Sequence, residues 1–385
     1  MSRRLLIVVQ EALFFTTHRL PVGLAMQQRG WEVHVAAPAD AAIAARLTAL
    51  GFHVHPIPLA RGGRDPVAEL RLLLAMLRLI RRLQPALLHL VSIKPVIWGG
   101  VAARLLGVPA VVHAITGLGF LFIRQDGRTG LLRRIIERLY AFALNHRNSV
   151  AIFQNGDDRT LFEQRGMVQP GRWVMIRGCG VDMNVFAAAP EPEINENNPP
   201  IVMFPARLLG DKGIHEFVGA AERLRAAGYR ARFVLVGRRD SDNPTDIGEA
   251  LLQQWVEAGV VEYWGYAEDM PAMLARAHVI VMPSYREGLP RGLIEAAATG
   301  RAIVTADVPG CREVVRHGEN GLLVPVRDAE ATAQAIAQLL DDPELRRRLA
   351  LRGRAMAEAE FSVERFVTES LAAYERVAGP LRSNP

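Results

Sequence analysis

The segment His278-Val-Ile-Val-Met-Pro-Ser-Tyr-Arg-Glu-Gly-Leu-Pro-Arg-Gly-Leu-Ile-Glu295 predicts a strand, a loop and a helix in succession. Its apolar start is typical of a buried strand in a parallel sheet. Pro290 is favoured at the beginning of a helix, and Gly300 at its end. Glu287 is therefore expected in the loop and Glu295 early in the helix.

A second segment with the same organisation lies upstream. The apolar run at 201–206 predicts a strand that ends at Arg207, and Lys212 and Gly213 lead into the next expected helix. In an open parallel sheet, the carboxyl ends of the strands form the ligand-binding crevice. The two segments therefore place two cations and two carboxylates at such an edge.

The rest of the chain predicts an α/β protein with two domains. Its 385 residues exceed the size at which a single core stops growing. Apolar runs alternate with segments long enough for helices, as in parallel sheets. The expected strands are 5–9, 32–37, 86–91, 110–115, 201–204, 232–236, 261–264, 279–282, 302–305 and 321–324. The Pro/Asn/Glu-rich stretch 187–200 is expected not to pack, which favours a domain boundary near 175–200.

The two acidic residues separated by seven positions, together with the upstream Arg207 and Lys212, resemble the family 4 retaining glycosyltransferases of the GT-B fold. The resemblance implies two Rossmann-like, doubly wound domains facing an interdomain cleft. Residues 1–175 would bind the acceptor and residues 176–362 the nucleotide sugar. The last helix, within 363–385, would cross back to the first domain.

The resemblance also implies roles for residues on the donor side. Arg207 and Lys212 would stabilise the leaving diphosphate, Glu287 would contact the donor sugar, and Glu295 the ribose hydroxyls. His113 would lie near the reacting sugar. Further donor contacts are expected from Gly288, Leu289, Gly292, Leu293, Gly265 and Tyr266. The two cations make a metal or a separate cofactor unnecessary, and Asp240-Ser-Asp242 is expected to be a solvated turn.

On the acceptor side the chain departs from many relatives, because Gln10 to Arg19 lacks their Gly-Gly turn. The Thr116-Gly-Leu-Gly-Phe120 motif is similar to enzymes that extend polyprenyl-diphosphate-linked sugars for bacterial surface polysaccharides. Candidate contacts to that acceptor are His18, Arg19, Lys94 and Arg124. The implied enzyme is a retaining hexosyl- or N-acetylhexosaminyltransferase that uses a UDP-sugar.

Charge is distributed unevenly along the chain. Residues 1–175 hold 22 Lys and Arg against 10 Asp and Glu, and residues 176–385 hold 24 against 30. Around 71–82 and 133–138, arginines alternate with apolar residues as in membrane-surface helices, although amphipathic helices of any doubly wound domain share this pattern. No apolar run spans a bilayer. We therefore expect a cytoplasmic protein, peripheral on the inner face of the cytoplasmic membrane and bound to anionic lipid.

Other classes of protein fit less well. Gly117-Leu-Gly119 lacks the third glycine of a dinucleotide-binding motif, and no P-loop motif is present. The basic segments lack the interleaved aromatics of nucleic-acid binding, so no nucleic-acid partner is expected. Two cysteines indicate a reducing compartment. A peripheral membrane assembly protein that keeps the transferase fold without turnover stays as the alternative.

Overall fold

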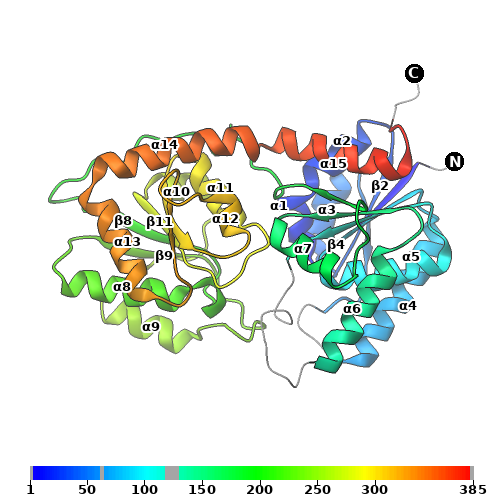
Figure 1. Cartoon of the computed structure of the whole chain (residues 1–385), viewed down its shortest axis with the longest axis horizontal. Helices are drawn as coiled ribbons and strands as arrows, with labels where there is room; N and C mark the ends of the chain where they lie inside the picture. The colour runs from blue at the N-terminus through cyan, green and yellow to red at the C-terminus, as the bar shows by residue number, and fades with distance from the viewer. Residues whose placement is uncertain (1–2, 61–64, 118–129, 382–385) are drawn as a thin grey trace. The chain divides into compact units, whose positions relative to one another are not determined.

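The computed structural model describes residues 3–60, 65–117 and 130–381, which form two compact units (Figure 1). Unit 1 comprises Met1–Gly180 and Glu364–Pro385, and unit 2 comprises Val181–Val363. Each unit contains one sheet in which all paired strands are parallel, with helices on both faces. This confirms the predicted α/β class with two parallel-sheet domains.

The sheet of unit 1 has seven strands in the order β3-β2-β1-β4-β5-β6-β7. They are β1 (Arg4–Val8), β2 (Glu32–Ala37), β3 (His53–Pro56), β4 (Leu87–Val91), β5 (Ala110–Ile115), β6 (Ser149–Phe153) and β7 (Trp173–Met175). The helices are α1 (Ala12–His18), α2 (Leu20–Gln27), α3 (Ala41–Ala49), α4 (Pro66–Leu83), the π-helix η1 (Pro95–Gly99), α5 (Gly100–Leu106), α6 (Gly130–Leu144), α7 (Gly156–Gln164) and α15 (Val363–Ala378). Alternate strand residues enter two apolar cores, one on each face.

The sheet of unit 2 has six strands in the order β10-β9-β8-β11-β12-β13. They are β8 (Ile201–Pro205), β9 (Arg232–Val236), β10 (Glu262–Tyr263), β11 (Val279–Met282), β12 (Ala302–Ala306) and β13 (Leu322–Val324). The helices are the 3₁₀-helix η4 (Gly210–Lys212), α8 (Ile214–Ala226), α9 (Glu249–Glu257), α10 (Met270–Ala275), α11 (Arg291–Ala298), α12 (Cys311–Val314), α13 (Ala329–Asp341) and α14 (Pro343–Glu360). Helices α8 and α13 pack side by side (Figure 1).

Three strands of unit 1 were not predicted. In β3, His53 and His55 alternate with less polar residues, so the segment lacks the apolar run that marked the other strands. Strand β7 has only three residues. Strand β6 is apolar and fully buried, and it follows α6 after the four polar residues 145–148.

The stretch 187–200 has no named helix or strand and no buried residue, as expected of a loop, but side chains of unit 2 hold it in place. The buried Arg301 donates hydrogen bonds to two of its backbone carbonyls, those of Ala189 and Pro190. Buried Arg346 binds Glu191 at 2.5 Å. These side chains, distant in the sequence, hold a segment that has few apolar residues of its own.

Candidate active site

Two loops follow neighbouring strands at the carboxyl edge of the unit 2 sheet. One runs from β8 through η4 to α8, and the other joins β11 to α11. They meet where Gly213, with φ of +79°, lies against the carbonyl of Pro283. A Cβ at Gly213 would lie 2.2 Å from that oxygen, so only glycine fits.

Lys212 and Glu287 are brought together by this contact between the loops. The Nζ atom of Lys212 donates to Oε1 of Glu287 at 2.5 Å. Both side chains are largely covered, with exposed fractions of 19% and 11%. Gly310 packs against the carbonyls of Glu287 and Gly288, where a Cβ would lie 2.6 Å from each oxygen. The carboxylate and the ammonium group therefore have defined positions.

Arg207 lies at the end of β8, where its Nη1 donates to Oδ2 of Asp240 at 2.6 Å. Asp240 was predicted to belong to a solvated turn, and its carboxylate instead orients the guanidinium. The Arg207 side chain is 35% exposed. It therefore offers further N–H donors to an anion at this edge.

Glu295 lies in α11, one turn beyond Arg291, whose Nε donates to Oε1 of Glu295 at 2.6 Å. Burial raises the pKa of Glu295, and the charge of Arg291 opposes that shift. Gly213 and Pro290 are the N-cap residues of α8 and α11, and no side chain of the described residues caps either helix. Such helix N-termini carry partial positive charge and free N–H groups that suit phosphate.

The other residues that were predicted to contact the donor lie at several different places in unit 2. Gly288 is buried beside Gly310, and Leu289 packs on an apolar core. Gly292 is in the first turn of α11, and the fully buried Leu293 donates its backbone N–H to Pro290. Gly265 accepts from the backbone of Gly237, and Tyr266 is 59% exposed. Among the described residues, neither Gly265 nor Tyr266 forms a hydrogen bond with Lys212 or Glu287.

In unit 1, His18 and Arg19 end α1 but differ in exposure. The His18 ring stacks on Phe14 at 4.0 Å between centroids, and its Nδ1 lies 2.7 Å from the hydroxyl of Thr17. Arg19 is 3% exposed, with its guanidinium 5.3 Å from the ring of Phe366. Burial lowers the pKa of Arg19. Arg19 is therefore enclosed in unit 1, whereas His18 is partly exposed.

Lys94, the other predicted acceptor cation in the described part of unit 1, is held by local partners. Its Nζ donates to Oε1 of Glu69 at 2.6 Å and to the carbonyl of Ala60 at 2.7 Å. Trp98 binds the second oxygen of Glu69 at 2.5 Å. The ammonium charge is therefore largely balanced within unit 1. Arg124 lies outside the described residues.

His113 is inside β5 and fully buried, with its ring near Gly100 and Ala143. Burial lowers the pKa of His113 to about 3, so the imidazole is neutral. Neither ring nitrogen has a hydrogen-bond partner among the residues that the structure describes. The ring therefore lies in the core of unit 1 in this structure.

Sequence reasoning overlooked Ser92, which follows β4 at the carboxyl edge of the unit 1 sheet. It has a φ of +74°, although it is not glycine. Its hydroxyl lies 3.0 Å from that of Thr116, and the π-helix η1 begins three residues later. Backbone strain and π-helices concentrate at functional sites. Neither feature leaves a signal in the sequence.

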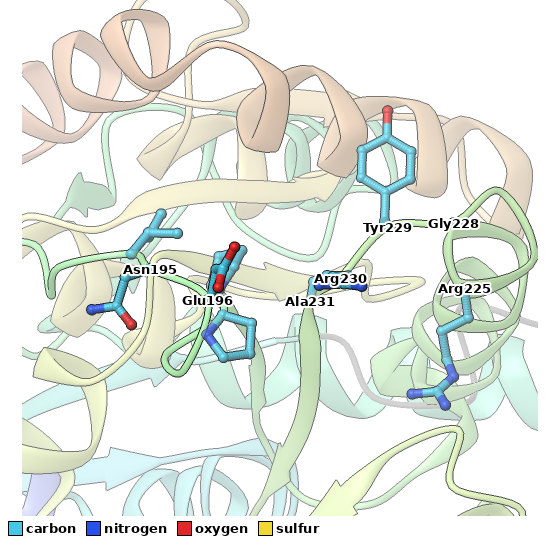
Figure 2. A pocket seen from close by; sticks show the side chains of 10 residues that line it. Asn195, Glu196, Arg225, Gly228, Tyr229, Arg230 and Ala231 are labelled. Atoms are coloured by element: carbon cyan, nitrogen blue, oxygen red, sulfur yellow. The ribbon is translucent and has the colours of Figure 1, made fainter.

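A hollow in unit 2 lies away from these residues (Figure 2). It is lined by Pro200 and Ala231, which directly precede β8 and β9, and by Arg225 and Tyr229. It is therefore at the amino edge of the sheet, opposite to the loops that carry Lys212 and Glu287. In parallel sheets ligands bind at the carboxyl edge.

Two family models match the chain, one in each unit. Residues 4–155 match the family described as "Glycosyl transferase 4-like", and residues 199–342 match "Glycosyl transferases group 1". The chain is 28% identical over 368 residues to the N,N'-diacetylbacillosaminyl-diphospho-undecaprenol alpha-1,3-N-acetylgalactosaminyltransferase of Campylobacter jejuni, covering 93% of this chain and 95% of that protein.

Two further likenesses extend the comparison. The chain is 25% identical to the UDP-Gal:alpha-D-GlcNAc-diphosphoundecaprenol alpha-1,3-galactosyltransferase of Escherichia coli, covering 72% of each chain. The crystal structure of Anabaena HepE with UDP and glucose is similar with a TM-score of 0.75 at 19% identity, covering 96% of this chain and 99% of that one. The predicted GT-B fold is thereby confirmed.

Proposed function

Because the chain belongs to the glycosyltransferase family whose two domains it matches, we propose that it transfers a sugar from a UDP-sugar to a polyprenyl-diphosphate-linked saccharide, with retention of configuration. The Lys212–Glu287 pair carries the proposal. It places a cation and a carboxylate in the loops that lead into α8 and α11 at a sheet's carboxyl edge, and no side chain of the described residues caps either helix. The names of the Campylobacter and Escherichia relatives support this acceptor class, and that of the latter supports UDP.

In the proposed reaction, the bond between the anomeric carbon and the β-phosphate oxygen breaks. The acceptor hydroxyl forms the new bond on the same face, and its proton passes to a phosphate oxygen of the leaving nucleotide. Charge on the diphosphate grows during this step. Lys212, Arg207 and the N-termini of α8 and α11 would stabilise that charge more strongly in the transition state than in the ground state.

Glu287 and Glu295 would bind the neutral parts of the donor. Glu287 is fixed beside Lys212 and would accept hydrogen bonds from sugar hydroxyls close to the diphosphate. Glu295 is further along α11 and would bind the ribose. Its largely buried carboxylate has a raised pKa, and hydroxyl donors would favour its ionised form.

We also propose that unit 1 binds an anionic bilayer through the exposed side of α4. Val67, Leu70 and Leu74 are exposed there by 54%, 56% and 40%. Arg71 and Arg78 are exposed at helical spacing along the same side. Within the described residues, no helix is both long and apolar enough to cross a membrane. Apolar side chains flanked by arginines suit the surface of an anionic membrane.

The test is an assay of the full chain with undecaprenyl-diphosphate-linked mono- and disaccharides and a panel of UDP-hexoses and UDP-N-acetylhexosamines. We expect a lipid-linked product one sugar longer, detected by mass spectrometry, with the anomeric configuration of the donor by NMR. Inversion would contradict retention alone. Absence of transfer and of donor hydrolysis across the panel, in a folded protein, would favour the assembly protein without turnover.

A further inference from the structure

Tyr285 joins the β11–α11 loop to the segment that contains Lys212, in addition to the Lys212–Glu287 ion pair. The backbone N–H of Tyr285 donates to the carbonyl of Asp211 at 2.9 Å. The Tyr285 hydroxyl donates to Oε1 of Glu216 at 2.8 Å. Tyr285 therefore binds the segment on either side of Lys212 and precedes Glu287 by two residues.

Glu216 is a well-covered partner for that hydroxyl. It is 8% exposed and lies in the first turn of α8. Its second carboxylate oxygen has no hydrogen-bond partner among the described residues. Loss of the remaining hydrogen bond would destabilise the fold, because it would leave the buried Glu216 carboxylate without a hydrogen-bond partner.

The Tyr285 ring is also fixed. The guanidinium carbon of Arg327 lies 4.7 Å from the ring centroid, and Arg327 has a φ of +60°, which is uncommon for a residue other than glycine. Burial and the bond to Glu216 raise the pKa of Tyr285 to about 12, so the hydroxyl keeps its proton and donates.

We propose that Tyr285 is a positioning residue of the transfer reaction, whose hydroxyl bond to Glu216 holds Glu287 against Lys212. The inference rests on the proposed function, since Lys212 and Glu287 are the groups that it positions. Loss of the hydroxyl would let the two loops shift while leaving the strands β8 and β11 in place. A displacement of such groups by about 1 Å is enough to lower turnover strongly.

The test compares Tyr285→Phe with Tyr229→Phe in the full chain. Tyr229 is a matched control, because its hydroxyl also donates to a carboxylate, Asp341 Oδ2 at 2.7 Å, but at the amino edge of the same sheet. With saturating acceptor, Tyr285→Phe should lower kcat about tenfold or more, with a smaller change in donor KM. Tyr229→Phe should leave kcat unchanged.

A double variant separates positioning from general destabilisation. If the hydroxyl acts through Lys212, then Lys212→Ala/Tyr285→Phe should have nearly the kcat of Lys212→Ala alone. Glu216→Gln keeps an acceptor oxygen and should retain most of the activity. If Tyr285→Phe melts at a lower temperature than Tyr229→Phe, the comparison is repeated with Glu216→Leu in place of Tyr285→Phe. Glu216→Leu should lower kcat to the same extent, and its effect should likewise not multiply with that of Lys212→Ala.

Two results would overturn the inference: wild-type kcat in both Tyr285→Phe and Glu216→Leu, or effects of Tyr285→Phe and Lys212→Ala that multiply. If either result is obtained while the wild-type enzyme is active, the proposed function is unaffected. A wild-type chain that uses no donor counts instead against the proposed function, on which the role of Tyr285 depends.

Discussion

Lys212 and Glu287 form a close ion pair across 75 residues of sequence, with Nζ and Oε1 2.5 Å apart. Glu287 takes one of the three N–H donors of the ammonium group, so the others can bind phosphate oxygens. The carboxylate thus orients the cation before a diphosphate arrives. Because the pair is mostly covered, its attraction is screened less than that of a surface pair.

The first prediction concerns the shape of this cation. Lys212→Arg keeps the charge, but the planar guanidinium is larger and does not fit as a compact donor between Glu287 and two phosphates, so kcat should fall. Lys212→Ala should lower kcat further, by about ten- to a hundredfold, because it removes a charge-assisted contact that strengthens as the nucleotide leaves. Initial rates across donor concentrations at saturating acceptor measure both effects.

A control is needed because Lys212→Ala leaves the Glu287 carboxylate without this partner. Lys212→Ala/Glu287→Gln removes that unbalanced charge and should recover thermal stability but not turnover. Lys94→Arg serves as the second control and should have the milder effect. Turnover at the wild-type rate in Lys212→Ala would show that this residue does not stabilise the leaving diphosphate.

The positions of these site residues followed from the sequence because they depend on local signals. Apolar runs located β8 and β11, Pro290 directly precedes α11, and Gly300 follows its last residue, Ala298, by two positions. The hydrogen bond of Tyr285 to Glu216 could not be predicted, because it joins loops whose approach depends on Gly213 and on tertiary packing. The burial of Arg19 and His113 likewise depends on neighbours far along the chain.

The membrane surface gives a second prediction. Leu70→Glu should reduce binding to vesicles containing phosphatidylglycerol, because it replaces an exposed apolar side chain by an anion beside Arg71. Leu351→Glu is the control, since Leu351 is a 72% exposed leucine on α14 of unit 2. Cosedimentation at low and high salt tests both. Equal binding of the two variants would place any membrane contact elsewhere than α4.

His113 is the subject of a third prediction. Its ring is neutral and enclosed, so His113→Leu should keep the fold and resist acid better than the wild type, because no buried imidazole then has to be protonated. Thermal melts at pH 7 and pH 5 measure this. Activity of the same variant decides its role: loss of kcat with an unchanged melting temperature would support the predicted contact with the reacting sugar, and normal kcat would assign the ring to the core alone.

The last prediction concerns the loss of stability at acidic pH. Strands β2 and β3 and helix α4 share a chain of hydrogen bonds. Arg82 lies 3.3 Å from Nδ1 of His55, and Nε2 of His55 lies 2.9 Å from Nδ1 of His34. Nε2 of His34 lies 3.1 Å from Glu32. Because Arg82 can only donate, neutral His55 accepts at Nδ1 and donates from Nε2 to Nδ1 of His34. The proton of neutral His34 is then on Nε2, the nitrogen that lies near Glu32.

Protonation of either ring breaks this chain, since the added N–H would face a donor. Burial lowers the pKa of His34 and lowers that of His55 to about 4, and the Arg4 hydrogen bond lowers the pKa of Glu32. An unfolded histidine, with a pKa of about 6.5, binds more protons than the folded one. Stability should therefore be constant above about pH 7 and fall as the pH drops from about 6.5 towards 4, where loss of the Glu32 charge adds to the effect.

Melting temperatures measured between pH 8 and pH 4 test this dependence in the wild type, in His55→Gln and in His53→Gln. Removal of His55 should reduce the fall below pH 6.5, because it removes a half-buried imidazole whose pKa is lower in the folded protein than in the unfolded chain. His53 is the control, since its side chain is 55% exposed beside the same Glu32. An identical acid slope in His55→Gln and the wild type would show that this hydrogen-bonded chain does not set the acid stability of unit 1.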